Sequence, residues 1–165
     1  MISKVVIPII IALMIVGCGA EKNELIPENS NNVRKESIME NEEVIMSNLK
    51  LVVNGKELDV VLEENSATVE LLSKLKNGDV VIHASEYGGF EKVGSLGFSL
   101  PTEDKQMTTE AGDIVLYQGN QISVFYDSNS WSYTKIGKIK DISQEELKNI
   151  LGDGEVTFTF IINQN

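Results

Sequence analysis

A glycine-rich stretch decides the fold of this chain, and it reads Ser85-Glu86-Tyr87-Gly88-Gly89-Phe90-Glu91-Lys92-Val93-Gly94-Ser95-Leu96-Gly97-Phe98-Ser99-Leu100-Pro101. It holds four glycines within ten residues, with aromatic residues between and beside them. Glycine at this density indicates a backbone that takes positive φ values or approaches another group closely. We therefore expect a long, ordered loop that lays aromatic rings and the charged pair Glu91 and Lys92 against the body of the domain.

Composition and charge limit the classes of protein that need to be considered. The chain has 165 residues and a formal net charge of −11. This length predicts one domain plus accessory segments. The acidic balance argues against a nucleic-acid partner, because phosphate binding needs a basic surface. Cys18 is the only cysteine, so an internal disulfide is excluded and the folded part must depend on its apolar core.

The N-terminus has the features of a secretion signal. Residues 5–16 are uncharged and almost wholly apolar, and Lys4 precedes them. Twelve apolar residues are too few to span a bilayer comfortably, which takes roughly 20, but they fit the apolar region of a signal peptide. The tetrapeptide Ile15-Val16-Gly17-Cys18 resembles the lipobox of bacterial lipoproteins. That resemblance implies cleavage before Cys18 and acylation of this residue.

Three segments follow from this reading: a signal peptide (1–17), a lipidated Cys18 with a flexible tether (18–47), and a folded domain (48–165). The tether is rich in Glu, Asn, Ser and Lys, a composition typical of a solvated spacer, although residues 33–46 could instead form a weak helix. An uncleaved anchor helix is the alternative for the N-terminus. With the lipid anchor, we expect the protein on the extracytoplasmic face of the cell membrane.

Turn and cap signals divide the first half of the domain. Asn54-Gly55 between two β-rich runs predicts a hairpin over Lys50 to Leu62, with positive φ at both turn residues. Residues 66–76 have a helical stripe that Asn65 or Ser66 can cap, and Asn77-Gly78 ends it. A strand over residues 80–84 leads into the glycine-rich stretch.

The second half reads as short strands and one more helix. Ser143 to Glu146 is typical of a capping box, which predicts a helix that ends at Gly152. The strands expected here, besides a short one near Gly97 to Leu100, are residues 114–117, 122–126, 131–133 leading into 136–139, and 155–162. About eight strands and two short helices predict a mainly β fold, a closed barrel whose open ends the helices cover.

Several segments of the domain resemble the bacterial cyclophilin-like family. They are Tyr87 to Pro101, Gly112 to Gln121, Phe125-Tyr126 with Asn129 to Thr134, and Ile136-Gly137-Lys138-Ile139. The resemblance extends from about Leu49 to Ile162. It implies a closed cyclophilin-like β-barrel with two helices, which is compatible with the order of elements read from the patterns.

The resemblance also makes prolyl isomerisation, the activity of true cyclophilins, a candidate function. That activity uses an arginine that donates to the prolyl nitrogen. Arg34 is the only arginine here, and it precedes the domain. Lys92, in the expected loop, is the available donor, but its flexible ammonium is a poor substitute for a planar guanidinium. The Phe-His-Arg motif of cyclophilins is absent too, because no arginine follows His83.

Other chemistry finds little support. His83 is the only histidine, and a single strand histidine is usually structural. The serines among the glycines lack a nucleophile-elbow pattern, and no phosphate-binding glycine fingerprint is present. Carboxylate pairs such as Glu103-Asp104 are typical of a solvated surface rather than of a calcium loop. We therefore nominate no catalytic residue, no metal site and no cofactor.

A binding cleft lined by aromatic side chains is the favoured hypothesis. Trp131 and Tyr133 alternate like one strand face, and they either form an exposed aromatic wall or plug the barrel. The residues expected to line the cleft are Tyr87, Phe90, Glu91, Gln118, Trp131 and Tyr133. The hypothesis is a membrane-anchored, monomeric domain that binds a small molecule or a peptide segment. A weak prolyl isomerase for secreted proteins and an interaction module of the cell envelope are the alternatives.

Overall fold

The computed structural model describes residues 49–162 of the chain. The predicted signal peptide (1–17) and the segment predicted to be a lipidated Cys18 with a tether (18–47) lie outside these residues. Of the helices in the described part, none combines the length and the apolar character needed to cross a membrane. The elements in chain order are β1 (Leu49–Val53), β2 (Lys56–Leu62), α2 (Ser66–Leu75), β3 (Val80–Tyr87), β4 (Glu91–Ser95), β5 (Lys105–Thr108), β6 (Asp113–Tyr117), β7 (Gln121–Phe125), β8 (Ser130–Ile139), α3 (Gln144–Leu151) and β9 (Val156–Ile162).

Eight of the strands form a closed antiparallel barrel, as predicted. The strand order is β2-β1-β9-β3-β4-β7-β6-β8, and a further pairing of β2 with β8 closes the ring. Gly137 of β8 lies at this seam opposite Leu62. A Cβ added to Gly137 would lie 2.3 Å from the Val61 carbonyl oxygen, so the two strands approach closely only because this residue has no side chain.

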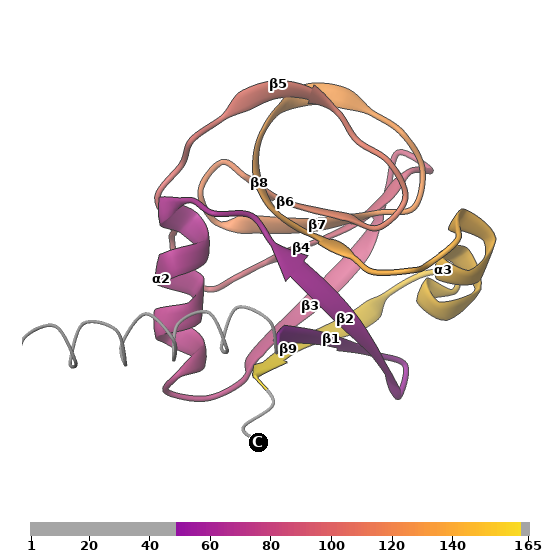
Figure 1. Ribbon diagram of the computed structural model, residues 1–165. Helices are drawn as coiled ribbons and strands as arrows, with labels where there is room; N and C mark the ends of the chain where they lie inside the picture. Colours follow the sequence, from indigo (N-terminus) through magenta and orange to yellow (C-terminus); the bar gives the residue numbers. More distant parts are fainter. Residues whose placement is uncertain (1–48, 163–165) are drawn as a thin grey trace, which may run out of the picture.

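The barrel encloses one apolar core that the two helices complete. Strand residues at alternate positions face inward, with Leu51, Ile82 and Phe160 fully buried. Figure 1 shows α2 and α3 on opposite sides of the barrel. The predicted stripe of α2 is confirmed, because Ala67, Thr68, Leu71, Leu72 and Leu75 are its buried residues. From α3, Leu147, Ile150 and Leu151 join the same core.

Two local predictions are confirmed in detail. Asn54 and Gly55 both have positive φ, 48° and 77°, and they connect Val53 to its cross-strand partner Lys56. The helix α2 begins at the N-cap Asn65, whose side chain accepts from the Thr68 amide. A complete capping box forms there with Thr68, whereas at α3 the observed bond runs from the Glu146 amide to the Ser143 hydroxyl.

The glycine-rich stretch is not the long loop that we expected. Its first part is a β-hairpin, in which β3 continues to Tyr87, turns at Gly88-Gly89, and returns as β4. Both turn glycines have positive φ, 68° and 79°. Gly94 lies inside β4, because its missing side chain lets the strand approach the His83 carbonyl oxygen of β3. Only Leu96 to Pro101 is irregular, so the strand expected near Gly97 to Leu100 is wrong as well.

A second, smaller layer lies outside the barrel wall. The strand β5, which is not among the strands expected from the sequence, pairs with the first half of β8. Figure 1 shows β5 and this part of β8 as an arch above β6 and β7. Between arch and wall lies a second apolar cluster of Val115, Phe125 and Tyr133, with Phe90, Met107 and Tyr117 packed against it.

Candidate functional site

A cavity of about 440 Å³ opens between the outer face of the barrel wall and the arch. Alternate residues of β4 and β7 face it, while the residues between them face the core. Five of the six nominated residues line this cavity together, and Gln118 does not. The full lining consists of Tyr87, Phe90, Glu91, Val93, Tyr117, Gln121, Ser123, Asn129, Trp131 and Tyr133.

Four of the five aromatic rings that line the cavity are connected through the buried ring of Phe125, and Trp131 is not among them. Tyr87 meets Phe90 edge to face with 6.1 Å between ring centroids, and Phe90 stacks on the buried Phe125 at 6.0 Å. Tyr133 then contacts Phe125 at 5.5 Å and Tyr117 at 6.0 Å, both edge to face. Such pairs stabilise one another by about 0.5–1.5 kcal/mol each beyond burial, so the walls of the cavity are pre-formed.

Trp131 and Tyr133 take up different positions, so neither of the two alternatives applies to both. The Trp131 side chain is 56% exposed at the rim of the cavity. Tyr133 is 5% exposed, and its hydroxyl accepts a hydrogen bond of 2.8 Å from the side-chain amide of Asn129. Tyr133 therefore forms part of the floor, and Trp131 provides a ring face that a ligand can cover.

Glu91 is the charged residue of the cavity. It is only 6% exposed, and its Oε2 is buried without a hydrogen-bond donor among the described residues. Burial raises the pKa of Glu91; the Ser123 hydroxyl offsets part of this rise, and the charge of Glu86 adds to it. A buried carboxylate oxygen without a donor costs free energy in the empty protein.

Lys92 does not belong to the cavity, and its expected place in a loop is wrong. It follows Glu91 in β4, so its side chain leaves the opposite face of the strand. The ammonium is buried, donates to the Gly154 carbonyl oxygen at 2.8 Å, and pairs with the Glu86 carboxylate at 3.0 Å. Both interactions lie on the side of α3 and the loop after it, so Lys92 has a structural role.

Glu86 is held in its ionised form by this second cluster. Burial by itself raises the pKa of Glu86, but hydrogen bonds from the Tyr126 hydroxyl and the Lys92 ammonium outweigh it, and the pKa is lowered. Tyr126 donates to Glu86 Oε1, and burial together with this bond raises the pKa of the phenol. The two neighbouring charged residues of β4 therefore have opposite environments: the Lys92 ammonium has partners, whereas Glu91 has an oxygen without a hydrogen-bond donor.

The comparisons with known proteins identify the family. The sequence profile described as "Cyclophilin-like family" matches residues 51–161 of the chain. The chain belongs to the cyclophilin-like family. None of the curated proteins matches it. Among solved structures, the chain is similar to a hypothetical protein from Archaeoglobus fulgidus, with 18% identity and a TM-score of 0.48, over 70% of this chain and 94% of that one.

Gln118 of this cyclophilin-like domain lies in the turn between β6 and β7 with a positive φ of 52°. It is exposed, and its amide donates to the hydroxyl of the lining residue Tyr117 at 3.1 Å. The lining residues that the sequence analysis missed are Val93, Tyr117, Gln121, Ser123 and Asn129. Strand alternation from Glu91 finds Val93, but only once β4 is known to be a strand.

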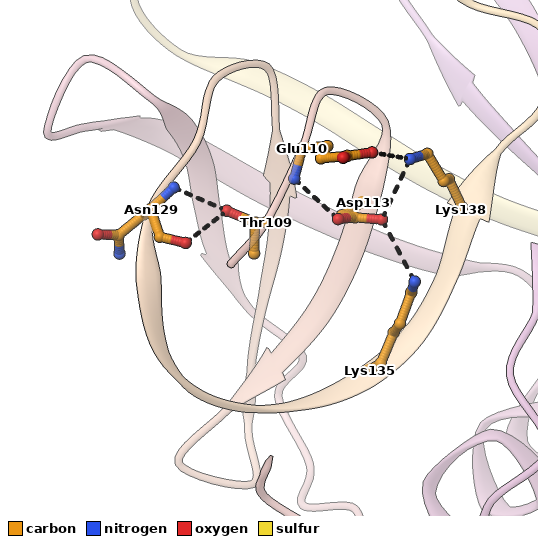
Figure 2. Close-up of polar contacts among 6 residues, drawn as sticks. All are labelled: Thr109, Glu110, Asp113, Asn129, Lys135 and Lys138. Atoms are coloured by element: carbon orange, nitrogen blue, oxygen red, sulfur yellow. Dashed lines mark hydrogen bonds and ion pairs between the residues drawn. The ribbon is translucent and has the colours of Figure 1, made fainter. Parts of the chain in front are cut away.

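A polar network fixes the segment that carries Asn129 (Figure 2). Thr109 and Asn129 share three hydrogen bonds. The backbone N–H of Thr109 at 2.8 Å and its hydroxyl at 3.1 Å both donate to the backbone carbonyl oxygen of Asn129, and the hydroxyl accepts from the backbone N–H of Asn129 at 2.9 Å. Thr109 directly follows β5, and Asn129 directly precedes its partner strand β8. These bonds join the two strands of the arch at its base, so the side-chain amide of Asn129 stays directed at the Tyr133 hydroxyl.

Asp113 anchors the other side of the same base (Figure 2). It is 3% exposed, and its Oδ2 accepts from the Glu110 amide at 2.8 Å. Its Oδ1 lies 3.5 Å from the Lys135 ammonium and 3.9 Å from that of Lys138, which also pairs with Glu110 at 2.8 Å. Since Lys135 and Lys138 belong to β8, the network ties the β5–β6 connection to the strand that forms the arch.

The remaining hollows in the cyclophilin-like domain are more polar. One of them, about 530 Å³, lies between the β1–β2 turn and α3 and is lined mostly by polar and charged side chains. His83 lines a smaller one with Glu155, and its Nδ1 lies 3.2 Å from the Thr157 hydroxyl. Within residues 49–162, no three His, Cys, Asp or Glu side chains are grouped so that they could hold a metal ion. The aromatic cavity is therefore the candidate site.

Proposed function

We propose that this protein is a membrane-anchored cyclophilin-like binding domain that takes a small molecule or a peptide segment in its aromatic cavity. The observation that carries the proposal is the buried Glu91 oxygen without a donor, inside a pre-formed cavity with aromatic walls. Ligand sites in proteins combine such apolar walls with a few polar groups that orient the ligand. The lipid anchor at Cys18 rests on the lipobox-like sequence.

Binding in this proposal takes place by stacking and by one polar contact. An apolar or aromatic part of the ligand covers the exposed face of Trp131 and lies against Tyr87 at the rim. A donor of the ligand reaches Glu91 and removes the cost of its unpaired oxygen. Because the rings already pack on one another, little ordering is needed on binding.

The isomerase alternative loses the donor on which it was based. Lys92 leaves the other face of β4, where Glu86 and the Gly154 carbonyl oxygen bind its ammonium. The described residues contain no arginine, and the cavity lining contains no lysine. Binding without catalysis is therefore the function that the geometry supports best.

A thermal-shift screen of the full chain against a small-molecule and peptide library tests the proposal. A ligand that binds the native state raises the apparent Tm. We expect Trp131→Ala to remove the shift, whereas Val69→Ala, which truncates another exposed apolar side chain on α2, leaves it unchanged. A library that raises the Tm of both variants equally, or of neither the variants nor the wild type, contradicts the proposal.

The anchor has a separate test. Cys18→Ser removes the thiol that the lipid modification needs. We expect the wild-type protein to incorporate labelled palmitate in a bacterial host and to sediment with the membrane fraction, and we expect the variant to incorporate none. Equal labelling of both proteins would show that Cys18 is not the lipidated residue.

A further inference from the structure

The charges that surround the aromatic cavity point to the chemical class of its ligand. Glu91 is the one charged side chain among the residues that line it. The other polar groups there are neutral amides and hydroxyls, from Gln121, Ser123 and Asn129 besides the tyrosines. No lysine or arginine of residues 49–162 lines the cavity to compensate a carboxylate. An anionic ligand is therefore repelled, and a cation finds the only full charge in its favour.

The aromatic walls favour a cation as well. Five of the lining residues carry aromatic rings: Tyr87, Phe90, Tyr117, Trp131 and Tyr133. The face of an aromatic ring is negative, so several rings around one space attract a cation that has shed part of its water. Trp131 lines the cavity and is 56% exposed, so its ring can still be covered by a ligand. Trp131 has the ring type with the strongest attraction for cations.

The unpaired Oε2 of Glu91 adds a requirement for N–H groups. A quaternary ammonium brings charge but no donor, and a neutral amide brings a donor but no charge. An alkylammonium or a guanidinium brings both, and hydrogen bonds between charged groups are roughly twice as strong as neutral ones. A volume of about 440 Å³ accommodates such a head group together with an alkyl stem.

We propose that the aromatic cavity binds an organic cation with N–H groups, an alkylammonium or a guanidinium, whose head pairs with Glu91 and whose stem lies on the rings of Trp131 and Tyr87. This inference rests on the proposed binding function and names its ligand class. The cation is either a free amine or the side chain of a lysine or arginine in a peptide.

Trp131 is the only tryptophan of the chain, so its fluorescence reports on this cavity alone. The full chain is titrated with n-butylammonium, n-butylguanidinium, butyramide and butyrate, at low and at moderate salt. We expect both cations to bind at least about tenfold more tightly than butyramide, and butyrate to give no response. The capped tripeptide Gly-Lys-Gly separates the sources: tighter binding than n-butylammonium indicates a peptide ligand, and weaker binding indicates a free amine.

Three variants decide the assignment. Glu91→Gln is expected to lower the affinity for the cations by about 10- to 100-fold and to leave that for butyramide within threefold, because it removes one charge at nearly constant volume. Glu145→Gln on α3 removes an equal charge outside the aromatic cavity and is expected to leave the affinity for all four probes unchanged. Trp131→Ala, in a side chain that is mostly exposed, is expected to weaken the cations, as followed by calorimetry.

The outcomes separate this inference from the proposed function. Equal affinity for butyramide and the cations, both lost in Trp131→Ala, overturns the cation assignment and leaves the binding function standing. Cation binding that survives in both Glu91→Gln and Trp131→Ala shows adventitious association with an acidic surface and overturns the assignment too. If neither the four probes nor any library compound alters the fluorescence or the Tm, both the inference and the proposed function fail.

Discussion

Glu91 and Lys92 are neighbours on one strand, are both nearly inaccessible to water, and are treated by the fold in opposite ways. Lys92 is 1% exposed and has two partners, the Gly154 carbonyl oxygen and the Glu86 carboxylate. Glu91 is 6% exposed and keeps a buried oxygen without a donor. One residue step along a strand reverses the face, so Lys92 points to the α3 side and Glu91 into the aromatic cavity.

This difference separates a charge with a structural role, Lys92, from the charge that we propose binds a ligand, Glu91. A buried charge with partners stabilises the fold that places them, and its removal leaves those partners without it. A buried charge with a free acceptor destabilises the empty protein, a cost that is typical of binding sites. Burial alone would give the two residues the same meaning, and only the inventory of partners distinguishes them.

The largest effect on stability is expected from Lys92→Met. This change removes the ammonium, keeps most of the stem, and leaves the Gly154 carbonyl oxygen and Glu86 Oε2 without the Lys92 donor. We expect the free energy of unfolding, measured with urea, to fall by about 2–3 kcal/mol. Lys74→Met, which breaks an exposed pair with Glu70 on α2, is expected to cost at most about 0.5 kcal/mol. Similar costs at the two sites would show that the partners of Lys92 stabilise the fold no more than an exposed ion pair does.

A change in the β3–β4 turn tests whether the turn sets the two faces of β4. Gly88 has a φ of 68°, and a Cβ there would lie 2.3 Å from the ring of Phe90. We expect Gly88→Ala to cost about 2 kcal/mol and to abolish the thermal shift by the ligand, because the Phe90 wall of the cavity moves.

The control for this prediction is the next residue. Gly89 has a φ of 79° but open space at its Cβ position. Gly89→Ala is expected to cost about 1 kcal/mol for the backbone conformation alone and to retain ligand binding. Loss of binding in both variants would mean that the ring of Phe90 is not what the turn positions.

A smaller effect of opposite sign is expected from Glu91→Gln. Burial raises the pKa of Glu91 in the folded state above the value of 4.5 that the carboxyl has in the unfolded chain. The folded state therefore retains the proton at pH values where the unfolded state has lost it. Stability is therefore lost as the pH rises through the interval above 4.5. The variant escapes this loss, and we expect it to be about 1 kcal/mol more stable than the wild type at pH 7.

The pH dependence provides the control for Glu91→Gln. At pH 4, where the wild-type carboxyl is mostly protonated in both states, the difference in Tm between the two proteins should be much smaller than at pH 7. A variant that is less stable at pH 7, or a difference that does not change with pH, would show that Glu91 is satisfied in the folded protein.

The smallest effect on stability is expected from Trp131→Ala. This side chain is 56% exposed, so its truncation should change the free energy of unfolding by no more than about 0.5 kcal/mol, like Val69→Ala. Together with lost ligand binding, this outcome would show that Trp131 serves binding rather than folding. A Tm that falls by many degrees in calorimetry would place Trp131 among the structural residues instead.

Short-range signals predicted most of the fold. Asn54-Gly55, the N-cap Asn65 and Gly152 act within a few residues of themselves, so their effects can be read from the local sequence. The glycine-rich stretch was misread, because a glycine in a turn and a glycine inside a strand look alike in sequence. Gly94 needs its lack of a side chain because of the His83 carbonyl oxygen on another strand. The strand β5 was missed, because its exposed residues carry no apolar alternation.

The lining of the aromatic cavity was predicted only in part, because some of its residues are placed by contacts between strands that are distant in sequence. Five nominated residues gather there, since aromatic side chains around a glycine turn and next to a polar loop are visible in sequence. Ser123 and Asn129 were missed, because the pairing of β7 with β4 and the bonds to Thr109 place them. Lys92 was assigned to the wrong surroundings, because its face depends on where β4 begins.

Most of the secondary-structure elements, the Asn54-Gly55 turn, the acidic charge and the aromatic inventory could thus be predicted from the sequence, because each depends on contacts within a few positions or on composition. The tertiary structure alone decided which buried charge has partners. A hydrogen-bond partner such as Gly154, 62 positions away from Lys92, is brought near only when the barrel closes and α3 packs on it.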